Sequence, residues 1–248
     1  YIAGEATVGQ IIRTFIPGSY SGDWFVPCYL LLMLLAPALN AYIDRCDKSE
    51  LLRFLIIFYA VQCVFGWLLH FWPFNNGYSL ISFSGLYILG RYIKLHLSTK
   101  ISRTITPVKG ISGYILLTTL ASAIVFLFLW LVDHEHLDKL CMTAFMRYTS
   151  PVNLTCTVML LLSFSRMSFS NRFINRLAQS SFVVYVIHLN PFVVNHYIAA
   201  SRWIYANFSI WGYAIGVIVF ASAVYLACAA ADQIRIWLWN VISRRIPA

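Results

Sequence analysis

Charged side chains are scarce in this sequence. Asp, Glu, Lys and Arg make up 11% of its 248 residues, and only nine residues are acidic. A soluble domain carries roughly 25% charged residues. Hydrophobic residues reach 60%, and the mean hydropathy is +0.73. The scarcity of charge therefore excludes a soluble domain and indicates an integral membrane protein.

Metal-binding and disulfide patterns are also missing. The six cysteines show no CxxC pair and no regular spacing, and most lie inside apolar runs, where cysteine behaves as a small hydrophobic residue. The run Asp133-His134-Glu135-His136 offers ligand chemistry, but its two histidines point apart on a helix and no zinc-type spacing follows. We interpret this run as a solvated loop. The sequence predicts no metal site, no disulfide and no bound cofactor.

The first residues have neither an initiator methionine nor a basic segment followed by an apolar one, the pattern of a secretory signal. We therefore expect the chain to be an N-terminally truncated part of a longer protein.

Long apolar runs fill most of the chain. A transmembrane helix needs about 20 mainly apolar residues. Seven segments fit, of which the third and fifth are short: Trp24–Ile43, Leu51–Trp72, Tyr78–Ile93, Ile111–Val132, Pro151–Ser165, Leu177–Ala200 and Ile210–Leu238. The sequence predicts an all-α, polytopic transmembrane helix bundle with about seven spans, forming one domain over residues 1–248.

The basic residues are distributed unevenly between the links that join these spans. Fourteen of the 18 Lys and Arg residues lie on alternate links, and the opposite links hold Arg13, Lys139, Arg147 and Arg202. Basic residues collect on the cytoplasmic side of a membrane. We expect the N-terminus outside and the C-terminus in the cytoplasm. The net charge of +9 reflects this topology and predicts no nucleic-acid partner.

One apolar run, residues 178–194, holds three residues that are unusual at membrane depth: His188, Asn190 and Pro191. Proline cannot donate a backbone hydrogen bond and its ring crowds the preceding turn, which predicts a bend. A bend beside His188 makes room for a ligand. The alternative is a histidine that only bonds a neighbouring helix.

Three further residues carry charge near span ends. Asp232 and Arg235 are three residues apart, so we expect a local ion pair on one helical face. Arg91 begins a cytoplasmic basic cluster that meets either an anionic cytosolic ligand or lipid phosphate.

Several stretches together resemble the acyltransferase-3 family of membrane-bound acyltransferases. The segment from Gly22 to Asn40 looks like the family's span that begins with Trp and ends in Leu-Leu-x-Pro, here Trp24 to Pro37. Phe83–Ile93 is similar to its Tyr-x-Leu-Gly-Arg-Tyr span, and Ala231–Arg235 suits its last span. The most specific is Ser181-Phe-Val-Val-Tyr185-Val-Ile-His188, which matches the family's late Ser-Phe-x-x-Tyr-x-x-His segment.

The resemblance implies a fold of about ten spans in the bacterial cytoplasmic membrane. It also implies transfer of an acyl group, often acetyl, from a cytosolic thioester donor such as acetyl-CoA to hydroxyls of a surface polysaccharide or a lipid-linked sugar. The partners it implies are the lipid bilayer, the acyl-CoA donor and the glycan acceptor. The family's basic residue with a catalytic histidine lies in a first span that this sequence does not contain, so we expect the fragment alone to be inactive.

The family's chemistry needs a general base near neutral pKa, usually histidine. The resemblance leaves the catalytic residue unknown, because the family's base histidine lies in the absent region, and His188 and Tyr185 are the candidates within this chain. Trp24, Tyr29 and Arg91 are candidate substrate-binding residues. Many members carry Glu at the position of Tyr29, and this departure places the chain nearer the exopolysaccharide- or capsule-modifying members.

Two functions from other classes compete with this interpretation. A transporter or flippase should show several charges at mid-membrane and an internal repeat, and the sequence has neither. A non-catalytic membrane scaffold needs no site and remains open.

Overall fold

The computed structural model describes residues 24–97, 106–131, 147–168, 170–188 and 190–243. All the regular elements in these ranges are helices, which confirms the predicted all-α class. The chain divides into two compact units, Trp24–Ser168 and a second whose described part is residues 170–188 and 190–243. A single domain over residues 1–248 stays a prediction.

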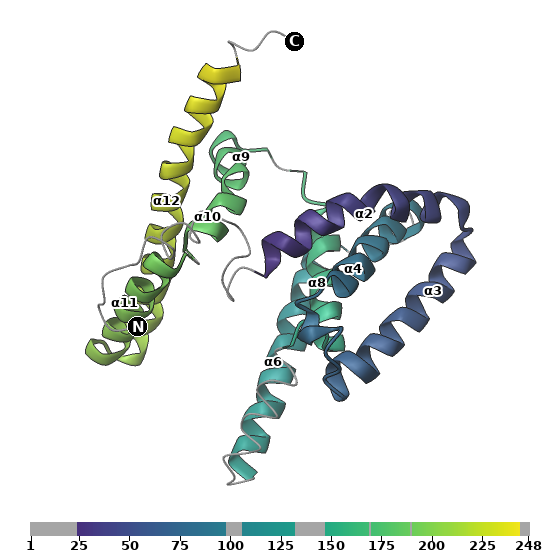
Figure 1. Ribbon diagram of the computed structural model, residues 1–248. Helices are drawn as coiled ribbons and strands as arrows, with labels where there is room; N and C mark the ends of the chain where they lie inside the picture. Colours follow the sequence, from purple (N-terminus) through teal and green to yellow (C-terminus); the bar gives the residue numbers. More distant parts are fainter. Residues whose placement is uncertain (1–23, 98–105, 132–146, 169, 189, 244–248) are drawn as a thin grey trace. The chain divides into compact units, whose positions relative to one another are not determined.

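The first unit is built from paired helices. Helix α4 packs against both α2 and α3, and α6 runs along α8 (Figure 1). Its elements in chain order are α2 (Phe25–Arg45), α3 (Lys48–Val61), η1 (Gln62–Leu68), η2 (Asn75–Gly77), α4 (Leu80–Tyr92), η3 (Ile93–Leu97), α6 (Pro107–Leu131) and α8 (Pro151–Phe164).

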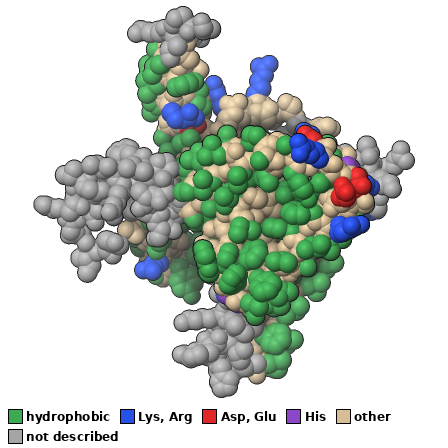
Figure 2. Space-filling model, turned by 45° about the vertical axis from the view of Figure 1, so that its right-hand side comes forward, with side chains coloured by type: hydrophobic (Ala, Val, Ile, Leu, Met, Phe, Trp, Pro, Cys, Tyr) green, Lys and Arg blue, Asp and Glu red, His purple; other side chains and the backbone are tan. Residues whose placement is uncertain are grey.

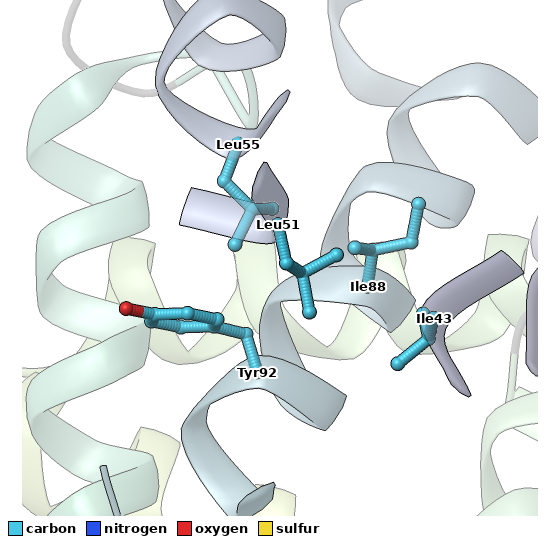
Figure 3. Packing of buried hydrophobic residues seen from close by; sticks show 5 residues of the cluster. All are labelled: Ile43, Leu51, Leu55, Ile88 and Tyr92. Atoms are coloured by element: carbon cyan, nitrogen blue, oxygen red, sulfur yellow. The ribbon is translucent and has the colours of Figure 1, made fainter. Parts of the chain in front are cut away.

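The core of this unit lies where α2, α3 and α4 meet. Its buried members come from all three helices and point toward one another: Ile43, Leu51, Leu55, Ile88 and Tyr92 (Figure 3). Figure 3 shows Leu51 in the middle of the cluster, between Leu55, Ile88 and Tyr92. The cluster fixes the antiparallel packing of α3 on α4.

A capping box sets the sharp turn from α2 into α3. The Asp47 carboxylate accepts hydrogen bonds from the amides of Ser49 (2.7 Å) and Glu50 (2.9 Å), and the Glu50 carboxylate accepts one from the Asp47 amide (3.0 Å). These bonds satisfy amides that have no partner within the helix. Hydrogen bonds from Ser49 and Glu50 lower the pKa of the Asp47 carboxyl below its ordinary value.

The chain reverses between α3 and α4 through a tight turn that contains η2. Asn75, Asn76 and Gly77 all have positive φ. At Gly77, where φ is +99°, an added Cβ would lie 2.5 Å from the Cβ of Tyr148. Only glycine fits here, because any side chain would meet both backbone strain and a collision.

The second unit contains α9 (Arg172–Gln179), α10 (Ser181–His188), α11 (Pro191–Asn207) and α12 (Ile210–Ser243), with α12 packed against both α10 and α11 (Figure 1). The chain bends by 83° between α10 and α11. Pro191 opens α11, a position where its missing N–H leaves no helical bond unmade. The predicted bend is confirmed, and it separates two helices.

Four described helices are long and apolar enough to cross a membrane, and the bent pair of α10 and α11 would make a fifth. The remaining predicted spans fall on two shorter helices, α4 with 13 residues and α8 with 14. The chain is thus a multi-pass membrane protein, and the count of seven stays a prediction.

The described surface agrees with a lipid environment. Hydrophobic side chains cover most of the face in Figure 2, and the charged ones lie toward its margin. None of the most apolar stretch of α6 is buried inside the protein. In water this surface would be strongly unfavourable, whereas hydrocarbon solvates it.

Candidate functional site

An aromatic cluster surrounds Trp24 at the start of α2. The centroid of its ring lies 4.4 Å from that of Tyr78, 5.7 Å from that of Phe83 and 6.0 Å from that of Tyr148. The rings meet tilted or edge-on, as their quadrupoles favour. These contacts join the start of α2, the start of α4 and the segment that leads into α8.

Tyr29 extends the cluster by one helical turn. Its ring stacks on Phe25, with centroids 6.0 Å apart and an interplanar angle of 8°, and Phe25 in turn contacts Trp24 at 5.9 Å. Tyr29 is 40% exposed. We call these six residues the aromatic cluster: Trp24, Phe25, Tyr29, Tyr78, Phe83 and Tyr148. The structure brings Trp24 and Tyr29, both predicted to bind substrate, onto one surface.

A cation lies beside the aromatic cluster. Arg147 precedes Tyr148, and its guanidinium Nη1 is 3.5 Å from the carbonyl oxygen of Trp67. Asn153 holds the Arg147 backbone by donating to its carbonyl oxygen at 2.8 Å. Partial burial lowers the pKa of the Arg147 guanidinium below its ordinary value. The sequence did not single out Arg147, because charge counting used it only to assign a side of the membrane.

Arg91 lies at the opposite end of α4 from the aromatic cluster. Eight residues separate it from Phe83, a rise of about 12 Å along the helix. Its guanidinium is 3.7 Å from the carboxylate of Asp44 on α2. One turn earlier, the Tyr87 hydroxyl donates to Asn40 Oδ1 at 2.9 Å. Arg91 therefore belongs to a polar contact between α2 and α4, separate from Trp24 and Tyr29.

His188 is the last residue of α10, and its Nδ1 lies 2.7 Å from the carbonyl oxygen of Val184. A carbonyl oxygen only accepts, so this bond places the proton on Nδ1 and leaves the lone pair of the neutral ring on Nε2. Nε2 is then the nitrogen that can take up a proton. The rings of Tyr185 and His188 lie 6.0 Å apart, edge to face, as their i, i+3 spacing predicts.

Hydrogen bonds tie the start of α10 to α12. The hydroxyls of Ser181 and Tyr225 are 2.9 Å apart, and the Tyr225 hydroxyl donates to the Leu177 carbonyl oxygen at 2.9 Å. Gln233 donates to the buried Ser180 hydroxyl at 3.3 Å. These contacts hold the helix that carries His188 in register with α12.

The predicted ion pair between Asp232 and Arg235 is confirmed, with 2.5 Å between Arg235 Nε and Asp232 Oδ1. The sequence did not predict its burial. The Asp232 side chain is fully buried, while that of Arg235 is 59% exposed.

The predicted site residues fall into two groups. Trp24, Tyr29 and Arg91 belong to the first unit, and Tyr185 and His188 to the second. Their roles in catalysis and substrate binding stay predictions. The histidine-rich loop at residues 133–136 lies outside the described residues.

Comparison with known proteins gives one match. A family model described as an acyltransferase domain, that of acyltransferase-3, matches residues 13–231. No curated protein and no solved structure shows significant similarity to the chain. The matched range covers both the aromatic cluster and the segment with Tyr185 and His188.

Proposed function

Because the chain belongs to the acyltransferase-3 family of membrane acyltransferases, we propose that it transfers an acyl group, most simply acetyl, to hydroxyls of a surface polysaccharide or lipid-linked sugar. The donor is a cytosolic thioester of the acyl-CoA type. The membrane is the bacterial cytoplasmic membrane, and the product is an O-acylated exopolysaccharide or capsule. The match to the acyltransferase domain carries this proposal.

The reaction exchanges a thioester for an oxygen ester. The acceptor hydroxyl oxygen forms a bond to the acyl carbon, the carbon–sulfur bond breaks, and the hydroxyl proton passes through a general base to the departing thiolate. A sugar hydroxyl is a weak nucleophile, so the base must lie within hydrogen-bond reach of it. The resemblance assigns the family's base to a first-span histidine outside these residues, and we assign His188, through the lone pair on Nε2, the role of a positioned proton-transfer group on the acyl or acceptor pathway. The aromatic cluster suits the acceptor, because aromatic faces pack well on the apolar faces of sugar rings.

The proposal is tested by measuring ester-linked acyl groups on surface glycans. A strain that lacks the full-length protein should lose these esters and regain them when the gene is restored. Membrane vesicles from the restored strain should move label from radioactive acetyl-CoA to glycan. If the glycan esters are unchanged by the deletion and the vesicles transfer no label, the protein does not carry out this reaction.

The orientation needs a separate test, because donor and acceptor lie on opposite sides of the membrane. The charge distribution predicts that residues 133–148 lie outside and residues 98–108 in the cytoplasm. In a background without native cysteines, His136→Cys should react in intact cells with a thiol reagent that cannot cross membranes. Ser102→Cys should react only after the cells are opened. The reversed pattern would contradict the assigned topology.

A further inference from the structure

The first unit encloses a small group of buried polar side chains. Gln62 is 3% exposed and Thr149 is 1% exposed. Within the described part of the chain, four buried oxygen atoms in this unit have no hydrogen-bond partner: Asn76 Oδ1 in η2, and a group of three formed by Gln62 Oε1, Thr149 Oγ1 and the Tyr59 hydroxyl. Two of these residues belong to the apolar helical stretch Lys48–Leu68, which is long enough to span a membrane.

The contacts of Gly66 place these groups on one side of that stretch. Gly66 follows Gln62 by four residues in η1, so the two lie on the same helical face. A Cβ added to Gly66 would lie 3.1 Å from Thr149 Cγ2. Together with Phe74, whose Cβ would lie 3.0 Å from the same added atom, Thr149 therefore covers the face of η1 that carries Gln62. Tyr59 precedes Gln62 by three residues and shares that side of the helix.

Buried oxygen atoms without partners are costly. Each one loses about 1–3 kcal/mol relative to a satisfied group, and hydrocarbon offers no water as a substitute. Three of them around one turn of η1 indicate that another molecule completes their hydrogen bonds. η1 is itself a π-helix, an irregularity found frequently at functional sites.

The kinds of atom involved restrict the ligand. Gln62 Oε1 is only an acceptor, so its partner must donate a hydrogen bond, whereas the Thr149 and Tyr59 hydroxyls can donate or accept. The thioester group itself offers acceptors alone and cannot satisfy Gln62 Oε1. A sugar carries several hydroxyls that both donate and accept. The polar group also adjoins the aromatic cluster, because Thr149 directly follows Tyr148, a cluster member that is 59% exposed.

We propose that Tyr59, Gln62 and Thr149 form a hydrogen-bonding subsite for hydroxyl groups of the acceptor sugar, reached from the aromatic cluster. This assignment rests on the proposed acyltransferase function and identifies the acceptor side of the reaction. The three oxygens are closed off in the unliganded protein, so the sugar must displace a covering side chain as it binds.

Apolar replacements of similar shape test the subsite. Gln62→Leu and Thr149→Val remove groups that have no partner in the unliganded protein, so the melting temperature should stay the same or rise. The KM for glycan acceptor should increase about tenfold for each, as expected for one lost hydrogen bond, while the KM for acetyl-CoA stays constant. Thr157→Val is the matched control, because the exposed Thr157 hydroxyl already donates to the Asn153 carbonyl oxygen at 2.8 Å. An acceptor KM that stays at the wild-type value in both variants overturns the subsite.

A labelling experiment tests the subsite without depending on transfer activity. In the full-length protein without native cysteines, Thr149→Cys should react slowly with a small thiol reagent added from outside. An alkyl glucoside should slow the reaction further, whereas an alkyl amine oxide of equal chain length, which carries no hydroxyl, should not. A Cys at position 149 that never reacts, or that both amphiphiles protect equally, rules out a sugar subsite. If labelling and protection occur but no glycan is acylated, the subsite stands and the proposed reaction fails.

Discussion

Replacing His188 by alanine in the full-length protein should lower the specific acyl-transfer activity by about 10²–10⁴-fold, the usual contribution of a positioned proton-transfer group. The bond between Nδ1 and the Val184 carbonyl directs the lone pair of Nε2 away from the helix backbone. The His188 side chain makes this hydrogen bond within its own helix. Even a hydrogen bond between two helices in a membrane contributes only about 1 kcal/mol to stability. The amount of folded protein should therefore change little. The experiment measures both the label transferred to glycan and the amount of monodisperse protein, and their ratio gives the specific activity.

His188→Asn separates the two roles of the imidazole. The asparagine amide can still donate to the Val184 carbonyl oxygen, but it cannot take up a proton at neutral pH. The asparagine variant should be as inactive as the alanine variant. His196→Ala serves as the control, because His196 is an exposed histidine of α11. Near-normal specific activity of His188→Ala, with less folded protein, would identify His188 as a structural residue.

The second large effect is expected at Trp24. Trp24→Ala removes the ring that contacts Phe25, Tyr78, Phe83 and Tyr148, and truncating a packed tryptophan costs about 3–5 kcal/mol. The fraction of folded protein should fall sharply in a thermal unfolding assay. Trp24→Phe keeps part of the ring contact and should fold, with a raised KM for the glycan acceptor.

The neighbouring turn supplies the control for this change. Trp72 is 80% exposed, so Trp72→Ala should leave both the unfolding temperature and the acceptor KM near their wild-type values. If Trp24→Ala behaves like Trp72→Ala, the ring contacts at the start of α2 contribute neither stability nor binding.

Local chemistry made several elements predictable from the sequence. Pro191 lacks an N–H, and a helix break lies directly before it. Asp232 and Arg235 pair because their spacing places them on one helical face. The last predicted span begins at Ile210, where α12 begins, and α12 then continues to Ser243. Helix α6 begins at Pro107, before the predicted span that starts at Ile111. The Thr106 hydroxyl accepts a hydrogen bond from the Lys109 amide, and Pro107 occupies the first helical position, so both residues favour a helix start there.

Contacts between distant residues could not be predicted in the same way. Thr149 reaches Gly66 across more than eighty positions, and Tyr87 bonds Asn40 across 47. An apolar run shows that a helix enters the membrane, but all its faces are hydrophobic, so periodicity does not reveal which face meets which neighbour. The π-helical turn at Gln62 also gave no sequence signal.

The length of α12 exceeds what a bilayer requires. Its 34 residues extend about 51 Å, whereas the hydrocarbon layer is about 30 Å thick. Counted from Ile210, the buried Asp232 lies about 33 Å along the axis, close to the far boundary of that layer. A thicker bilayer would draw Asp232 into hydrocarbon unless α12 changed its tilt. Since Tyr225 and Gln233 bond the start of α10, a change in tilt would also move the helix that carries His188. Lipid chain length thereby becomes a physical variable that acts on the position of the candidate catalytic residue His188.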